Sequence, residues 1–312
     1  MLLLAAAACM SQRTGTKPGA PAPKTESRTV VVYPLAGCIT EAEGFLKRSD
    51  WKAANPTQAR FLAMLPAIRR EKAKIPELVS KASESSDEIH RFLAAHGFPN
   101  LRLQPWSPPD FGMASVLKIQ EKWLQRGAED TVFTYGENDD RTEYPGVALR
   151  EGISTYQWQA SDYPVVGIKT KGGDTVYLAE FPEADLPKGD LDLLALAQRL
   201  VKEKTADLEN PIIQITFPMV ELNQRPDVSW FIGLSIGSSS IAQAIQETRV
   251  KLDLEGATVE SAAAMEATRG GGPRLYQISR PFLCVITRPG LSQPFLVGYF
   301  NHDSWHAPIK KS

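Results

Sequence analysis

A change of pattern near residue 113 most constrains the fold of this 312-residue chain. Before it, apolar residues recur at helical spacing, as Phe61, Leu65 and Ile68 do within residues 57–85. After it, short runs rich in valine, isoleucine and aromatic residues dominate, and such runs are typical of strands. Helices first and mostly antiparallel strands later predict an α+β fold, because a doubly wound sheet would alternate strands with helices.

Proline, glycine and serine residues divide this pattern into expected elements. Pro66 and Pro76 should divide the first helical stretch, and a further helix should begin at Ser86 and stop at Gly97. Further helices are expected at residues 192–208 and 238–248, a hairpin around residues 172–173, and strands at residues 28–36, 114–124 (also compatible with a helix), 131–136, 154–159, 164–170, 174–182, 211–222, 249–254, 273–279, 281–288 and 294–300.

The composition is ordinary for a globular protein, with 43% hydrophobic and 23% charged residues. A chain of this length can bury a substantial core. The formal net charge of -1 argues against a nucleic-acid partner, because phosphate contacts need clustered lysine and arginine. No stretch approaches the about 18 to 20 apolar residues of a transmembrane helix. No cofactor is expected.

The N-terminus carries a pattern of its own. An apolar run at residues 2–8 ends in Ala-Ala-Ala-Cys, which resembles the bacterial lipobox and makes Cys9 the expected lipidation site after a signal segment at residues 1–9. The run is short and no lysine or arginine precedes it, so an apolar N-terminus without a targeting role is the alternative. Residues 10–28 have a disordered linker composition. This predicts an extracytoplasmic domain at residues 29–306, attached to a bacterial membrane through lipid only or secreted, with a tail at residues 307–312.

Two cysteines lie within the expected domain. Outside the cytoplasm Cys38 and Cys284 could form a disulfide. We prefer the interpretation that both are small buried residues.

The segment LDLEGATVESAAAMEATRGGGPR, residues 252–274, fits two structures. With a period of two, the charge of residues 257–268 falls on one face, and the other face carries only small or apolar residues, namely Ala257, Val259, Ser261, Ala263, Met265 and Ala267. That alternation indicates a strand, yet alanine, glutamate and methionine also favour a helix. Gly256 and residues 270–272 supply mobile ends, and the small side chains would let a strand enter between existing strands.

Several stretches of residues 113–306 resemble serpins, the serine-protease inhibitors, in the order in which that family has them. The stretch 249–264 is similar to the strand, Glu-Gly and alanine-rich hinge that open the reactive loop. The similar strands are residues 165–182, 211–222 (where Phe217 precedes Pro218), 280–286 with its Pro-Phe pair, and 293–301 with Gly298. The stretch EKWLQRG resembles the Lys-Trp segment at the top of the central sheet, which implies that sheet opening begins at Trp123.

The resemblance implies one serpin-like domain with a reduced N-terminal helical part, and an inhibitor of serine-type endopeptidases rather than an enzyme. A bait loop at about residues 256–280 would be cleaved and inserted into the central sheet. The implied hinge residues are Glu255, Gly256, Ala257, Thr258, Val259, Ser261, Ala262, Ala263 and Ala264. Inhibitory serpins usually have Thr or Ser at the position of Ala257, and small residues at those of Val259 and Glu260. These departures leave a non-inhibitory surface lipoprotein of the same fold as the first alternative.

Counting from Gly256 as the family does places the scissile bond near Gly270 and Gly271. Arg269, one residue earlier, predicts a trypsin-like serine protease as the partner, with Arg274 a second choice. The inhibitor is expected to act as a monomer.

A serine hydrolase is the rival from another class. The stretch GLSIG matches G-x-S-x-G, with Ser235 as the nucleophile and Asp253 and His302 or His306 as partners. The chain lacks alternating strand–helix units, which argues against it. The same two histidines lie four residues apart, a metal-ligand spacing on a helix, but a solvated tail without metal is the preferred interpretation.

Overall fold

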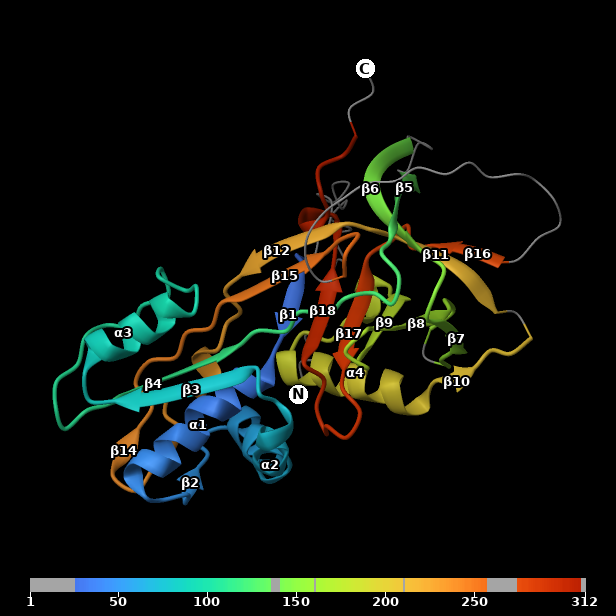
Figure 1. Ribbon diagram of the computed structural model, residues 1–312. Helices are drawn as coiled ribbons and strands as arrows, with labels where there is room; N and C mark the ends of the chain where they lie inside the picture. The colour runs from blue at the N-terminus through green and yellow to red at the C-terminus, as the bar shows by residue number, and fades with distance from the viewer. Residues whose placement is uncertain (1–25, 136–140, 160, 210, 257–273, 310–312) are drawn as a thin grey trace, which may run out of the picture.

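The computed structural model describes residues 26–135, 141–159, 161–209, 211–256 and 274–309. Figure 1 shows three N-terminal helices gathered at one end of the molecule and the large sheets at the other. One hydrophobic core joins the first two of these helices to the sheets, since Tyr33 and Phe61 belong to the same cluster as Phe282 and Tyr299, whereas the third helix packs in a smaller cluster of its own. The α+β prediction is therefore confirmed.

The first helix was not expected from the sequence. Strand β1 (Arg28–Val30) ends where residues 28–36 were predicted to continue as a strand, and α1 (Val32–Leu46) begins two residues later. Tyr33, Ala36 and Ile39 are fully buried along one face of α1. Their spacing of three is helical, but the run of valines before them reads as a strand.

Two further corrections concern the helical stretch. Pro66 lies inside α2 (Pro56–Glu71) and does not divide it, since Leu65 and Ile68 are buried on either side. After the short helix η1 (Lys72–Lys74) the chain forms β3 (Leu78–Ser83), which pairs antiparallel with β4 and is not helical. Helix α3 (Ser86–Ala95) is as predicted, although Ser85 rather than Ser86 caps its start.

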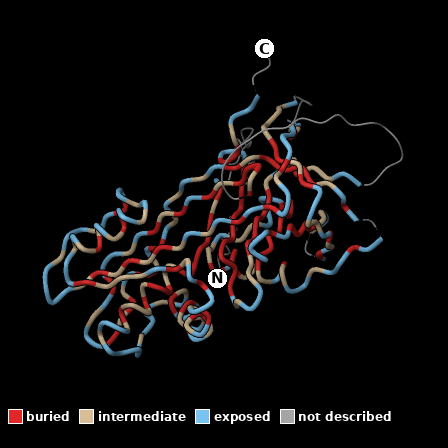
Figure 2. Tube along the Cα trace, viewed as in Figure 1, coloured by how far each residue is buried: buried red, intermediate tan, exposed pale blue. Residues whose placement is uncertain are grey.

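A seven-stranded antiparallel sheet forms the centre of the core, in the order β1-β18-β17-β9-β8-β7-β10. Its strands β9, β17 and β18 are buried almost throughout, as Figure 2 shows. Helix α4 (Asp190–Glu203) packs against β1 and β18. The strands not yet bounded are β7 (Ile153–Gln157), β8 (Val165–Lys169), β9 (Thr175–Glu180), β10 (Thr205–Ala206), β17 (Phe282–Thr287) and β18 (Leu296–Phe300). The hairpin between β8 and β9 is as predicted.

Smaller sheets surround this centre. A four-stranded sheet has the order β16-β11-β6-β5, and two separate two-stranded sheets pair β3 with β4 and β12 with β15. A third group pairs β14, β13 and β2. Their bounds are β2 (Trp51–Lys52), β4 (Gly112–Leu117), β5 (Ala128–Tyr135), β6 (Arg141–Leu149), β11 (Ile212–Pro218), β12 (Val220–Gln224), β13 (Ser235–Ile236), β14 (Ser239–Ser240), β15 (Thr248–Leu252) and β16 (Arg274–Gln277), with short helices η2 (Glu183–Asp185), η3 (Ser229–Phe231) and η4 (His302–Ser304) between elements.

The predicted helix at residues 238–248 is wrong. This segment contains β14, and irregular chain leads from it into β15. Its alanines and glutamines favour a helix locally, but Ile241 and Gln246 are buried by contacts with distant parts of the chain. Gln246 donates a side-chain hydrogen bond to the carbonyl of Val31 at 2.9 Å. Tertiary contacts therefore override the local preference.

The folded region extends beyond the predicted boundaries at residues 29 and 306. Ser27 is buried, and its hydroxyl donates to Asp303 at 2.6 Å, so residues 27 and 28 are not linker. At the other end the amide of Ile309 donates to the carbonyl of Glu143 at 2.8 Å. Among the described helices, none is long and apolar enough to cross a membrane.

Candidate functional site

The most distinctive feature of the molecule is an open slot between two short sheets. In the described part of the chain, β4 pairs only with β3 and β15 pairs only with β12, so each leaves one edge unpaired. A cavity of about 740 Å³ lies between these two edges. Unpaired strand edges present backbone donors and acceptors that can take up another strand.

Helices cover both faces of the slot, while the space between the two strand edges stays open. Ala114 and Val116 of β4 pack against Ile89 and Leu93 of α3. The next residue in the strand, Ser115, points the other way, toward α1, where a Cβ on Gly37 would overlap its side chain. The slot therefore has α1 beneath it and α3 above it.

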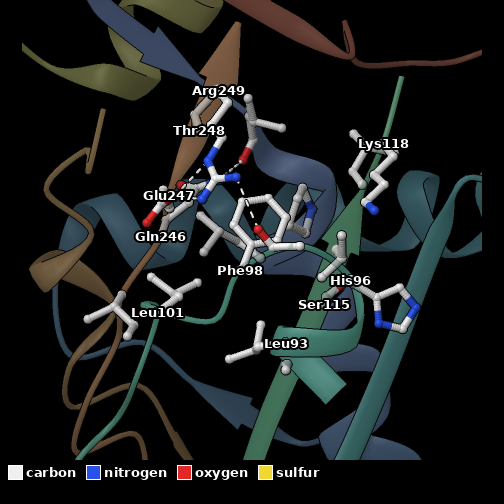
Figure 3. A pocket seen from close by; sticks show the side chains of 18 of the residues that line it. Leu93, His96, Phe98, Leu101, Ser115, Lys118, Gln246, Glu247, Thr248 and Arg249 are labelled. Atoms are coloured by element: carbon white, nitrogen blue, oxygen red, sulfur yellow. Dashed lines mark hydrogen bonds and ion pairs between the residues drawn. The ribbon is translucent and has the colours of Figure 1, made fainter. Parts of the chain in front are cut away.

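The walls of the cavity are mainly apolar, with charged groups near one end. Leu93, Phe98 and Leu101 line it on the α3 side, as Figure 3 shows. Leu35 and the half-buried thiol of Cys38 line it from α1. The other cysteine of the described residues, Cys284, is fully buried, and both are free. The disulfide considered from the sequence is therefore not formed, and Cys284 has the buried position that we preferred.

Trp123, in the segment after β4, is hydrogen-bonded to the segment after β15. Its indole is 1% exposed, and Nε1 donates to the carbonyl of Asp253 at 2.9 Å. Its amide donates to the carbonyl of Glu255 at 3.1 Å, and its ring meets Phe217 edge to face. Glu255 also forms an ion pair with Arg126. The segment after β4 is thus fastened to the segment after β15.

Gly256 is the last described residue of the stretch after β15, and it lies beside the segment that follows β4. It forms an antiparallel bridge with Lys122, and its carbonyl accepts a hydrogen bond from the amide of Asp253 at 3.0 Å. Its φ is +146°, and a Cβ there would lie 2.7 Å from Cα of Lys122 and 2.9 Å from the carbonyl carbon of Glu121. Only glycine fits this conformation and this close approach.

A buried acidic network lies directly beside this glycine. The Glu121 side chain is 4% exposed and accepts a hydrogen bond from the hydroxyl of Thr170. Desolvation raises the pKa of Glu121 to about 7, and Asp174 adds to this rise through a hydrogen bond and through its charge. Arg288 joins Asp174 at 3.0 Å to Glu77 at 2.9 Å, and the hydrogen bond from Arg288 lowers the pKa of Glu77. Because these groups come from four distant segments, no pattern in the sequence predicts that they lie close together.

The structure brings together three of the predicted site residues, Trp123, Glu255 and Gly256. The remaining predicted hinge and cleavage residues, and the lipidation site, lie outside the described residues: Ala257, Thr258, Val259, Ser261, Ala262, Ala263, Ala264, Arg269, Gly270, Gly271 and Cys9.

The structure contradicts the serine hydrolase alternative. Ser235 lies in β13, which turns into the strand β14 and not into the helix that a nucleophile elbow requires. Strand β13 also pairs with β2 at the helical end of the molecule, whereas His302 lies in η4 beside Tyr144 of β6 and Trp305. Asp253 accepts a hydrogen bond from the amide of Glu255 at the base of the slot. These residues do not form a triad.

The two C-terminal histidines do not share a helix. His302 lies in η4, and His306 lies beyond its end. Ser304 and Trp305 between them are buried, which corrects the prediction of a solvated tail. In the described ranges no group of three or more His, Cys, Asp or Glu residues is placed to hold a metal ion.

Solved structures share this architecture. The chain is similar to Serpin48 of the insect Tenebrio molitor, with a TM-score of 0.54 and 10% identity, over 89% of this chain and 92% of that one. It is similar to native tengpin, a thermophilic serpin, with a TM-score of 0.58 and 11% identity over 89% of each chain. It also resembles thyroxine-binding globulin in complex with thyroxine, with a TM-score of 0.53 and 10% identity, over 88% of this chain and 92% of that one.

No family model matches the sequence, and no curated protein matches it either. At such low identity the structural likeness concerns the fold alone. The chain has the serpin fold, as the sequence motifs predicted.

Proposed function

We propose that the protein inhibits serine-type endopeptidases, with residues 257–273 as a bait loop that enters the slot between β4 and β15 after cleavage. One observation carries the proposal: Gly256 already lies between the end of β15 and the segment that follows β4. The chain that continues from it needs only to extend along the slot to become an added strand.

The slot offers a favourable place for such a strand. An inserted strand would pair with the unpaired edge of β4 on one side and that of β15 on the other. It would also fill a largely apolar cavity of about 740 Å³ with side chains. In a serpin-type inhibitor, the free energy released when the loop fills the slot drives the displacement and distortion of the protease.

The chemistry belongs to the protease. Its serine hydroxyl attacks the carbonyl carbon of Arg269, the bond to the nitrogen of Gly270 breaks, and that nitrogen leaves as a new amino terminus. Arg269 is then held as an ester on the protease. Residues 257–269, once extended, would span about 43 Å at about 3.3 Å per residue, so insertion would carry the protease far from its starting position.

The fold also permits a second function, because the similar solved structures include a thyroxine-binding globulin. Ala257, Val259 and Glu260 differ from the usual inhibitory pattern, and they favour this alternative, a non-inhibitory protein with the serpin fold. We place either protein outside the cytoplasm as a monomer, lipidated at Cys9 after a signal segment and held off a bacterial membrane by the linker that starts at residue 10.

The deciding experiment mixes the full chain, carrying Cys9→Ser to prevent lipidation, with trypsin and separates the products on a denaturing gel. Inhibition predicts a band at the summed mass that survives boiling, together with loss of trypsin activity. Arg269→Ala serves as the matched control and should abolish the band. Clean cleavage after Arg269 with fully active trypsin would refute inhibition and favour the second function.

A further inference from the structure

Gly256 fixes the register of any strand that continues it into the slot. On one side it bridges Lys122 in the antiparallel sense, and on the other it faces Asp253 through a backbone hydrogen bond. In an antiparallel ladder each step forward moves the partner one step back. In such a strand, residue 260, four steps beyond Gly256, would therefore lie opposite Lys118 on one side and Arg249 on the other.

Both edges of the slot agree with this register. Continued further, it places residues 258–265 opposite residues 113–120 on one side and residues 244–251 on the other. Every residue of these two stretches lines the cavity. The two ladders were fixed by independent contacts of Gly256, yet they assign the same segment to the same space.

The faces of the strand agree as well. In this register Ala262 and Ala264 would fall opposite Val116 and Ala114, whose side chains pack against α3. Val259 falls opposite Val250, which belongs to the main core. A slip of one residue would exchange these faces and turn Glu260 toward the core.

A slip of two residues would leave every side chain of the inserted strand on the same face. Another feature must therefore distinguish registers that differ by two residues. Lys118 and Arg249 meet at Gly97: Arg249 donates to its carbonyl at 3.0 Å, and a Cβ on Gly97 would lie 3.8 Å from Nζ of Lys118. Figure 3 shows both cations at the cavity, with dashed lines from Arg249 to Glu247.

The cations outnumber the anions there. Glu247 is shared by Arg249 and Arg225. Lys118 has no ion pair with any residue in the described ranges. A carboxylate on an inserted strand that lay between Lys118 and Arg249 would therefore be attracted by a cation on each side of the slot.

We infer that Lys118 and Arg249 form an acceptor for the carboxylate of Glu260, which sets how deep the inserted strand sits. This inference rests on the proposed function, because it requires the loop to enter the slot. In inhibitory serpins this position usually has a small residue, so Glu260 counted against inhibition in the sequence. On this inference its carboxylate instead selects one register of the inserted strand. Glu266 falls opposite Gly112 and Gln243, which carry no charge, and is the matched control.

The test compares the melting temperatures of intact and loop-cleaved protein for the full chain with Cys9→Ser and for its Glu260→Gln and Glu266→Gln variants. Limited digestion with a metalloprotease, which uses no serine nucleophile and so forms no trapped ester, supplies the cut, and mass spectrometry verifies that it falls within residues 267–273. We expect cleavage to raise Tm in all three. The rise should be smaller in Glu260→Gln by about 2 to 4 °C, with intact proteins unchanged. The exchange of charges in Lys118→Glu with Glu260→Lys should restore much of that difference.

A cross-link gives an independent reading of the register. Lys118 and residue 260 would be a non-hydrogen-bonded pair, whose side chains come close enough for a disulfide. Lys118→Cys with Glu260→Cys should therefore cross-link after cleavage, and Lys118→Cys with Glu266→Cys should not. Equal rises in Tm for both glutamine variants, or equal cross-linking, would overturn the acceptor and leave loop insertion standing. No rise in Tm in any protein would overturn insertion and the acceptor with it.

Discussion

Replacing Gly256 with alanine tests whether the close approach at the entrance of the slot holds the molecule together. The φ of +146° costs a non-glycine residue about 1 to 3 kcal/mol. The added Cβ must also displace backbone, since it would lie 2.7 Å from Cα of Lys122, and such overpacking costs about 1 to 3 kcal/mol. The two terms together predict a loss of about 2 to 6 kcal/mol, or about 4 to 24 °C in Tm.

Gly173→Ala is the matched control, because Gly173 also has a positive φ, +86°, but open space around a Cβ. It carries the conformational cost alone. Differential scanning calorimetry of both variants therefore isolates the contact with the backbone at Glu121 and Lys122. An equal drop in Tm for the two variants would show that the close approach contributes nothing, and the account of the entrance would be wrong.

Two further predictions concern the same entrance. Trp123→Phe leaves the buried carbonyl of Asp253 without its indole donor and should cost about 1 to 3 kcal/mol, which denaturant titration measures; an unchanged midpoint would refute the role of that hydrogen bond. The pKa of Glu121 is about 7 in the folded state against its ordinary value of 4.5, so between these values the folded state holds a proton that the unfolded state has lost. Stability should therefore fall as pH rises from about 4.5 to about 7, and Glu121→Gln should gain stability relative to the unsubstituted protein across that window. Parallel pH profiles of the two proteins in thermal melts would contradict this.

The sequence predicts the later half of the fold well, for a physical reason. Strands such as β9, β17 and β18 are continuous apolar runs bounded by turn residues, and they are buried on both faces. The errors fall where local preference and tertiary context disagree. Helix α1 follows a valine run, and β3 owes its structure to pairing with β4.

The candidate site divides in the same way. Glu255, Gly256 and Trp123 were identified through resemblance to a family, and the structure places them in contact. The Glu121 network and the pair of cations at Gly97 were invisible in the sequence. Each joins residues that are separated by dozens of positions, and no local pattern records that the fold brings them together.

The entrance and the cations suggest two different controls on one movement. If the loop inserts as we propose, Trp123 and the bridge of Gly256 would hold the first residue of the added strand in place, and this would lower the entropy lost when the next residues enter. The raised pKa of Glu121 means that the same entrance is weakened when this buried carboxyl ionises beside Asp174. On the same proposal, Lys118 and Arg249 would act later, only after four more residues had entered. A change at the entrance should therefore alter the rate of insertion, whereas a change at the cations should alter the stability of the inserted state, and the two effects can be measured separately.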